Sequence, residues 1–270
     1  MTLPIDLVLV RHGQSEGNAA KRLSEAGDHS AFTRDFLDRH SASLRLTDKG
    51  REQARQAGAF LREEFFKDWR GFDRCYTSEY IRAKETAGLL DLSGAEWYCD
   101  FYLTERDWGE MDICSEEERE TKYGMEMRRR QIEPFFWRPP GGDRFVLVCL
   151  FVDKILETLH RECENKRVLI VCHGEVMRAF QVKLERMSQE RFKRLTFSNL
   201  PTDKIYNCQI VHYTRRSPVD GTLAPYAGWV RWIRPTATPL QQTEWKKIVR
   251  QRYTNEQLLE VVNRVPAMIT

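Results

Sequence analysis

The apolar residues of this chain fall into short unbroken runs and into longer stripes with helical spacing. Residues 7–10 and 168–172 are unbroken apolar runs, as expected of strands buried on both faces of a parallel sheet. In segments 47–65 and 145–164, apolar residues recur three or four positions apart, which predicts amphipathic helices. The alternation of the two patterns predicts an α/β fold, a three-layer α/β/α sandwich around a mostly parallel central sheet.

Both apolar runs end in a histidine that is followed by a glycine. Arg11, His12 and Gly13 follow the first run, and His173 and Gly174 follow the second. Open α/β sheets bind ligands at the carboxyl edge of their strands, so a cation, imidazoles and backbone N–H groups would meet there and suit a phosphate. One such ending could be a surface strand end. Two independent strands with the same ending favour a shared site.

The segments between these elements are less regular. Residues 19–43 form a polar, irregular segment, long enough to be a lid-like insertion. A brief strand at 72–76 is followed by a helix that Ser78 would cap. An alternating strand at 207–213 is expected to close the edge of the sheet and to pair with residues 226–233.

The chain is expected to form one domain with an appendage. Residues 1–213 hold the predicted α/β domain, and residues 214–270 form a C-terminal strand/helix extension packed on it. Residues 254–262 have the pattern of a capped amphipathic helix that docks on the body or on a partner. The charged segment 115–131 is expected to be helical.

Composition argues against several classes of protein. The 43 basic and 40 acidic residues give a net charge of +3, too little to indicate a nucleic acid partner. The seven cysteines include no Cys-x-x-Cys pair, which argues against a disulfide framework or a zinc site. No apolar run approaches the ~18 residues of a membrane span, and no signal peptide is recognised. We therefore expect a cytoplasmic, reducing setting and no membrane association.

Some charged and nucleophilic residues allow two interpretations. The basic clusters 128–130 and 215–216 are surface charges unless they line the pocket. Lys21 and Arg22 could reach an anionic substrate, or they could be exposed loop charges. Cys172 precedes the second histidine, but its place in a strand favours a small core residue over a catalytic thiol.

Five short motifs are spread over the first three quarters of the chain. They are Arg11-His12-Gly13-Gln14-Ser15 with Asn18, Leu46-Thr47-x-x-Gly50, Ser78-x-x-x-Arg82-Ala83-x-x-Thr86-Ala87, Leu103-x-Glu105-Arg106-x-x-Gly109 and His173-Gly174. Together they resemble the histidine phosphatase superfamily, in the larger branch of this phosphoglycerate-mutase-like group. The resemblance covers roughly residues 5–213.

The resemblance implies a role for each motif residue. His12 would be the nucleophile that forms a phosphohistidine, and Glu105 the general acid and base, a better candidate than Glu110. The other residues that the resemblance places around the phosphate are the clamping arginines Arg11 and Arg82, the donor His173, and the substrate-binding Asn18, Gly174 and Arg106. No cofactor is implied, and no metal, since arginines and histidine would supply the positive charge.

The lead hypothesis is a metal-independent phosphomonoesterase, a histidine acid-base phosphatase acting on a small-molecule phosphomonoester or a phosphoprotein. The alternative is a mutase-type phosphoryl transferase. Mutases carry a lysine shortly after the glutamate motif, whereas residues 112–118 here are mainly acidic, although Lys122-Tyr123-Gly124 and the triple arginine echo the mutase pattern. A non-catalytic phosphate-binding protein is a third hypothesis, but it would need a broken site. A homodimer is left open.

Overall fold

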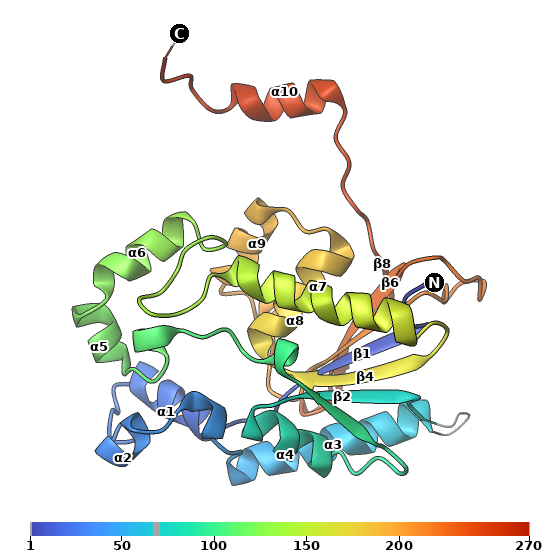
Figure 1. Ribbon diagram of the computed structural model, residues 1–270, viewed down its shortest axis with the longest axis horizontal. Helices are drawn as coiled ribbons and strands as arrows, with labels where there is room; N and C mark the ends of the chain where they lie inside the picture. Colours follow the sequence, from blue (N-terminus) through green and yellow to red (C-terminus); the bar gives the residue numbers. More distant parts are fainter. Residues whose placement is uncertain (1, 67–70, 270) are drawn as a thin grey trace.

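The computed structural model describes residues 2–66 and 71–269, and its centre is one mixed β-sheet (Figure 1). Strand order is β3-β2-β4-β1-β5-β6-β7, with β8 also paired to β6. The strands are β1 (Asp6–Arg11), β2 (Arg74–Ser78), β3 (Trp97–Asp100), β4 (Arg167–Cys172), β5 (Ile210–Thr214), β6 (Trp229–Arg234), β7 (Gln241–Gln242) and β8 (Lys246–Lys247). The first four strands of the order run parallel, and the later strands are antiparallel.

The register of the two central strands fixes the position of the site. β1 and β4 are parallel neighbours, with Leu9 opposite Ile170 and Arg11 opposite Cys172. Both strands therefore reach the same sheet edge at the same level, and His12 and His173 follow directly. The prediction that the two His-Gly endings meet at one carboxyl edge is confirmed.

Helices cover both faces of the sheet because successive strand residues point to opposite sides. Leu7 and Leu9 face the cluster built with α7 (Phe145–Glu162) and α8 (Gly174–Glu185). Val8 and Val10 face α3 (Asp48–Phe65) and α4 (Ile81–Leu89) on the other side. The expected α/β sandwich is thus confirmed.

The remaining helices lie mainly at the ends of this sandwich. In Figure 1, α1, α2, α5 and α6 gather on one side of the molecule. The bounds are α1 (Glu16–Glu25), α2 (Arg34–Leu37), α5 (Glu116–Thr121), α6 (Gly124–Ile132), α9 (Gln189–Thr196) and α10 (Asn255–Asn263), with short 3-10 turns at Ser41–Ser43, Phe101–Leu103, Gly109–Met111 and Pro201–Asp203. None of the helices in the described part of the chain is long and apolar enough to cross a membrane.

One local expectation was wrong. The start of segment 19–43 belongs to helix α1, because Ser15 and Asn18 form a reciprocal capping box at its N-terminus. The expectation that segment 115–131 is helical is confirmed, as two helices with a second capping box at Ser115 and a break before Gly124.

The C-terminal extension agrees with expectation in part. The predicted pairing of residues 207–213 with 226–233 is confirmed by β5 and β6. β5 is nevertheless an inner strand and not the edge, because β6 continues the sheet beyond it. Helix α10, by contrast, is exposed along its whole length, including Leu259 and Val262 at 61% each. Figure 1 shows it at the end of an extended segment, away from the sheet. The strands of the extension are thus integral to the fold, and the helix does not pack on the body as expected.

Candidate active site

A pocket of about 370 Å³ lies where β1 and β4 end. Residues from five segments of the chain line it, among them both sheet-edge motifs and parts of the 19–43 segment. The lining includes Arg11, His12, Asn18, Lys21, Phe32, Phe36, Ser41, Arg82, Glu105, Trp108, Asp112, Arg119, Arg130, Gly174 and Glu175. The pocket therefore brings together most of the residues that the sequence selected.

His12 is held as a neutral imidazole with a defined tautomer. Its Nδ1 lies 2.7 Å from the Gly13 carbonyl oxygen, which can only accept, so Nδ1 carries the proton. Its Nε2 accepts from Arg82 Nε–H at 3.2 Å. Burial, followed by the positive charges of Arg82 and Arg11, holds the pKa of His12 well below its usual value. The Nε2 lone pair is therefore available as a nucleophile.

Both arginines line the same pocket as His12, and backbone carbonyls hold each guanidinium group. Arg82 is 7% exposed, and its Nη1 donates to the Ser41 carbonyl at 2.7 Å. Arg11 donates from Nη1 to the Ile205 carbonyl at 2.5 Å. Its buried Nε has no hydrogen-bond partner among the described residues. Backbone acceptors thus fix both guanidinium groups without cancelling their charge, as an anion-binding pair requires.

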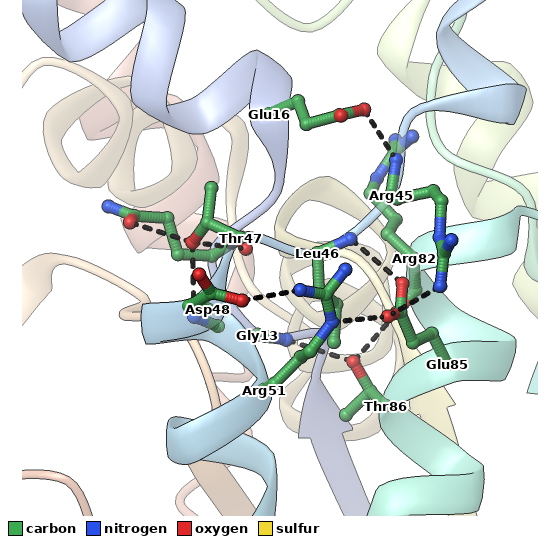
Figure 2. Close-up of polar contacts among 12 residues, drawn as sticks. Gly13, Glu16, Arg45, Leu46, Thr47, Asp48, Arg51, Arg82, Glu85 and Thr86 are labelled. Atoms are coloured by element: carbon green, nitrogen blue, oxygen red, sulfur yellow. Dashed lines mark hydrogen bonds and ion pairs between the residues drawn. The ribbon is translucent and has the colours of Figure 1, made fainter.

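A hydrogen-bond network on α4 locks the Arg82 turn to the first motif (Figure 2). Thr86 Oγ1 accepts from Gly13 N–H at 3.0 Å and donates to the Arg82 carbonyl at 2.7 Å. Glu85 accepts from Arg51 Nε at 2.8 Å and from the Leu46 N–H at 2.9 Å. The helix that carries one clamping arginine is therefore tied both to the turn after His12 and to α3.

Gly13 is required for close packing rather than for a left-handed turn. A Cβ at Gly13 would lie 2.3 Å from the Gly50 carbonyl oxygen, and a Cβ at Gly50 would lie 2.0 Å from the Gln14 carbonyl oxygen. The φ angle of Gly13 is not in the positive range. The two motif glycines thus allow the start of α3 to press directly against the turn after β1.

His173 is fully buried and lies with its ring 5.1 Å from that of His12. Its Nε2 is 2.8 Å from Ser78 Oγ, and this oxygen already accepts from Tyr80 N–H at 3.3 Å. A hydroxyl oxygen can accept two hydrogen bonds, so Ser78 Oγ either donates to Nε2 or accepts from it, depending on the tautomer of His173. Nδ1 has no hydrogen-bond partner in the described part of the chain.

This arrangement corrects one expectation. Ser78 does not cap α4, whose N-cap is Tyr80, but ends β2 and orients His173. Burial and the charge of Arg82 hold the pKa of His173 well below its usual value. A neutral imidazole ring is still a hydrogen-bond donor through the nitrogen that carries its proton.

Glu105 lines the same pocket and has the pKa expected of a general acid. Burial raises its pKa to about 7, the negative charge of Glu175 adds to the increase, and Arg82 and Arg11 oppose it. One oxygen accepts from the Arg106 N–H at 3.2 Å. Glu110 lies outside this environment: it is exposed and accepts from the Tyr123 hydroxyl at 3.1 Å.

The three predicted substrate-binding residues differ in their placement. Asn18 lines the pocket, and its carbonyl oxygen accepts from Asn207 Nδ2 at 3.0 Å, so its own NH₂ group can face a ligand. Gly174 also lines the pocket, as the first residue of α8, where backbone N–H groups point toward an anion.

Arg106 is not among the residues that line the pocket, although it contacts Glu175 and Trp108, which are. It is 3% exposed, and its guanidinium donates to the carbonyls of Asp143 at 2.9 Å and Trp137 at 3.1 Å. It is also paired with Glu175 at 3.5 Å. Its donors are therefore used within the protein, where they hold the 137–143 loop and Glu175 in place.

Other residues near the site were either missed or correctly set aside. Thr86 belongs to a quoted motif but was given no role, and nothing in the sequence indicates that Asn207 donates to the His12 carbonyl at 3.1 Å. Cys172 is fully buried, and burial raises the pKa of its thiol, so it is a core residue. In residues 2–66 and 71–269, no group of three or more His, Cys, Asp or Glu side chains could hold a metal ion.

Two adjacent parallel strands, β1 and β4, end in paired histidines. Together with two arginines and a desolvated glutamate, these histidines define a class of phosphoryl-transfer proteins. The chain belongs to the histidine phosphatase superfamily (branch 1), whose family model matches residues 7–208. A 2,3-bisphosphoglycerate-dependent phosphoglycerate mutase of Azorhizobium caulinodans is 33% identical over 193 residues, which cover 68% of this chain and 83% of the mutase.

The solved structures that resemble this fold include phosphatases. A mycobacterial glucosyl-3-phosphoglycerate phosphatase in complex with VO3 has a TM-score of 0.60 at 18% identity, covering 90% of this chain and 100% of that one. A putative alpha-ribazole-5'-P phosphatase from Escherichia coli has a TM-score of 0.59 at 18% identity, covering 83% of this chain and 96% of that one. At this identity the likeness concerns the fold alone.

Proposed function

We propose that the protein is a phosphomonoesterase that acts through a phosphohistidine on His12. The observation that carries the proposal is the fixed tautomer of His12, whose Nε2 lone pair lies 3.2 Å from Arg82 Nε at the bottom of the pocket. A neutral imidazole next to unneutralised guanidinium groups can attack a bound phosphate without first losing a proton.

The first half of the reaction transfers the phosphoryl group to the protein. His12 Nε2 forms a bond to phosphorus as the bond from phosphorus to the alcohol oxygen breaks, in line with the attack. Arg11 and Arg82 bind the equatorial oxygens, and His173 donates to one of them as charge develops. Glu105 gives its proton to the departing oxygen.

The second half returns the protein to its initial state. Water attacks phosphorus, its proton moves to the Glu105 carboxylate, and the phosphorus–nitrogen bond to His12 breaks. The products are the free alcohol and inorganic phosphate. Because positioned cations and hydrogen-bond donors supply the stabilisation, the proposal needs no cofactor.

A mutase is the second candidate, supported by the names of relatives that are 30–33% identical to this chain. Against it stands the acidic run after Gly109, from which Asp112 lines the pocket and Glu116 occupies α5. In a mutase the phosphoryl group would pass from His12 to another hydroxyl of the bound intermediate instead of to water.

Incubation with 3-phosphoglycerate and a catalytic amount of 2,3-bisphosphoglycerate separates the two candidates. The proposal expects steady release of inorganic phosphate with little 2-phosphoglycerate. Fast isomerisation with little phosphate would establish the mutase instead. The pocket volume of about 370 Å³ favours a small-molecule substrate over a phosphoprotein. We also infer a cytoplasmic setting, supported by seven free cysteines.

A further inference from the structure

A second pocket, of about 860 Å³, lies between the α/β domain and the C-terminal strands. Its walls come from α8, α9, the 3-10 turn Pro201–Asp203 and the strands β6, β7 and β8. These three strands lie beyond residues 7–208, which match the family model. The part of the chain outside the matched region therefore helps to build a pocket that the proposed reaction does not use.

The second pocket combines an aromatic surface with a group of cations. Val230 and Trp232 pack against the core cluster on the α8 side of the sheet and form the base of the pocket. Arg234 follows on the same sheet face, because alternate residues of β6 point to the same side. Its guanidinium carbon lies 3.8 Å from the centre of the Tyr206 ring, which also lines the pocket. The exposed cations of the pocket are Lys204, Lys246 and Lys247.

Six cations but only two acids line the second pocket. Both acids already have partners within the protein. Glu185 accepts from Arg191 Nη2 at 2.9 Å and from the Tyr213 hydroxyl at 3.3 Å. Asp203 accepts from the Ser198 hydroxyl at 2.6 Å. The positive charge of the second pocket is therefore offset only in part.

Most of the remaining cations have no acidic partner. Within the described residues, no ion pair engages Lys204, Lys246 or Lys247. In the same part of the chain, the buried Nε of Arg234 has no hydrogen-bond partner. Burial lowers the pKa of Arg178, another cation of the pocket. A bound anion would stabilise these charges and supply the missing acceptor.

One short segment, residues 204–209, connects the second pocket to the active site. The residues of this segment that line the second pocket are Lys204, Tyr206 and Gln209. The residues between them hold the catalytic motif. The Ile205 carbonyl accepts from Arg11 Nη1 at 2.5 Å, and the Asn207 side chain donates to the His12 carbonyl at 3.1 Å. A ligand that contacts this segment from the second pocket therefore acts on the supports of both catalytic residues.

We propose that the second pocket binds a nucleoside polyphosphate, and that this ligand changes catalysis through residues 204–209. The aromatic lining suits the base, and the exposed lysines suit a chain of phosphates. The volume falls in the range of about 300–1,000 Å³ that is usual for small-molecule sites. This inference goes beyond the proposed function, because it concerns a ligand that is not turned over.

The first test is a calorimetric titration with the active site filled by phenylphosphonate. The probes are adenylyl imidodiphosphate, tripolyphosphate and adenosine, which separate the contributions of the base and of the phosphates. Adenylyl imidodiphosphate should bind about 10- to 100-fold more tightly than either of the other two. Equal affinity for tripolyphosphate would show that the pocket takes only an anion and would overturn the nucleotide assignment. Absence of binding by adenylyl imidodiphosphate would overturn the whole inference.

Substitution of one lysine locates the ligand. Lys246→Gln should weaken the binding of adenylyl imidodiphosphate about tenfold, because one charge-assisted contact is lost. It should leave kcat and KM for phenyl phosphate unchanged when no nucleotide is present. Arg252→Gln is the matched control, since Arg252 is exposed in the segment after β8 and does not line the second pocket. Equal affinities of the two variants would place the ligand elsewhere and refute the site.

The second test measures the link to the active site. With phenyl phosphate as substrate, saturating adenylyl imidodiphosphate should change kcat at least about twofold, in either direction, because residues 204–209 support Arg11 and His12. A rise in KM with unchanged kcat would mean competition in the active site and would contradict the inference. Binding with no change in either constant would refute the link through residues 204–209. Because calorimetry needs no turnover, absence of phosphate release from phenyl phosphate would refute the proposed function alone.

Discussion

The pKa of Glu105 leads to a prediction about how the leaving group and the pH act together. An alkoxide needs a proton in order to depart, whereas p-nitrophenolate leaves without one. Burial raises the pKa of Glu105 to about 7, with the charge of Glu175 as the second cause. The protonated form is therefore the main species below about pH 7, and its fraction falls roughly tenfold between about pH 6 and pH 8.

For an alkyl phosphate, kcat/KM should follow that fraction and fall as the pH rises through about 7. For p-nitrophenyl phosphate, the same decrease of kcat/KM with rising pH should be much smaller. Glu105→Gln should lower kcat/KM for the alkyl substrate about 10²- to 10⁴-fold and abolish the pH dependence of that value. The same variant should lower kcat/KM for the aryl substrate far less. Glu110→Gln is the control and should be mild with both, because Glu110 is exposed.

Stopped assays of phosphate release across the pH range would measure both profiles. Glu175→Gln provides an independent test, because removal of a neighbouring negative charge should move the alkaline limb to lower pH. Equal damage from Glu105→Gln on the two substrates would mean that Glu105 positions the phosphate and is not the acid. If kcat/KM for the alkyl substrate instead fell around pH 4.5, the ordinary carboxyl pKa, burial would not raise the pKa of Glu105 to about 7.

Three further predictions follow from the site and its support. Rapid quench with labelled substrate should trap an acid-labile, alkali-stable phosphoryl adduct on His12. Intact turnover without this adduct would show that His12 is not the nucleophile. Ser78→Ala should lower kcat about 3- to 10-fold, since the orienting hydrogen bond to His173 is lost. Gly50→Ala should destabilise by about 2 kcal/mol or more in denaturant unfolding, because its Cβ would lie 2.0 Å from the Gln14 carbonyl oxygen. Gly88→Ala, with nothing within 4 Å, should instead be neutral or stabilising.

The sequence predicted the parts of the site that depend on strand order. His12 and His173 are brought together by parallel pairing of β1 and β4, which two buried apolar runs with the same ending already imply. Arg82 and Glu105 could be selected only through the resemblance to a family, because a helical arginine and a loop glutamate are ordinarily surface residues.

The residues that the sequence could not place depend on side-chain packing between distant segments. Ser78 has the local pattern of a helix cap, but its partner is a histidine 95 positions away. Arg130 is one of three consecutive arginines, and only the docking of α6 on Trp108 decides which of them reaches the pocket. Arg106 was expected beside the substrate because the motif specifies its residue type and spacing. The motif does not show that the carbonyls of Asp143 and Trp137 bind the Arg106 guanidinium group.

The arrangement of charges in the free site explains how one pair of arginines can serve two purposes. Burial, and then the positive charges of Arg82 and Arg11, lower the pKa of His12, which favours an unprotonated Nε2 before substrate arrives. The same positive charges, desolvated and only partly balanced by Glu105, favour entry of a phosphate dianion. Binding of the dianion offsets these charges, and proton transfer from Glu105 becomes unfavourable until the leaving oxygen gains negative charge. In the proposed mechanism, the Glu105 proton therefore moves only as the phosphorus–oxygen bond breaks.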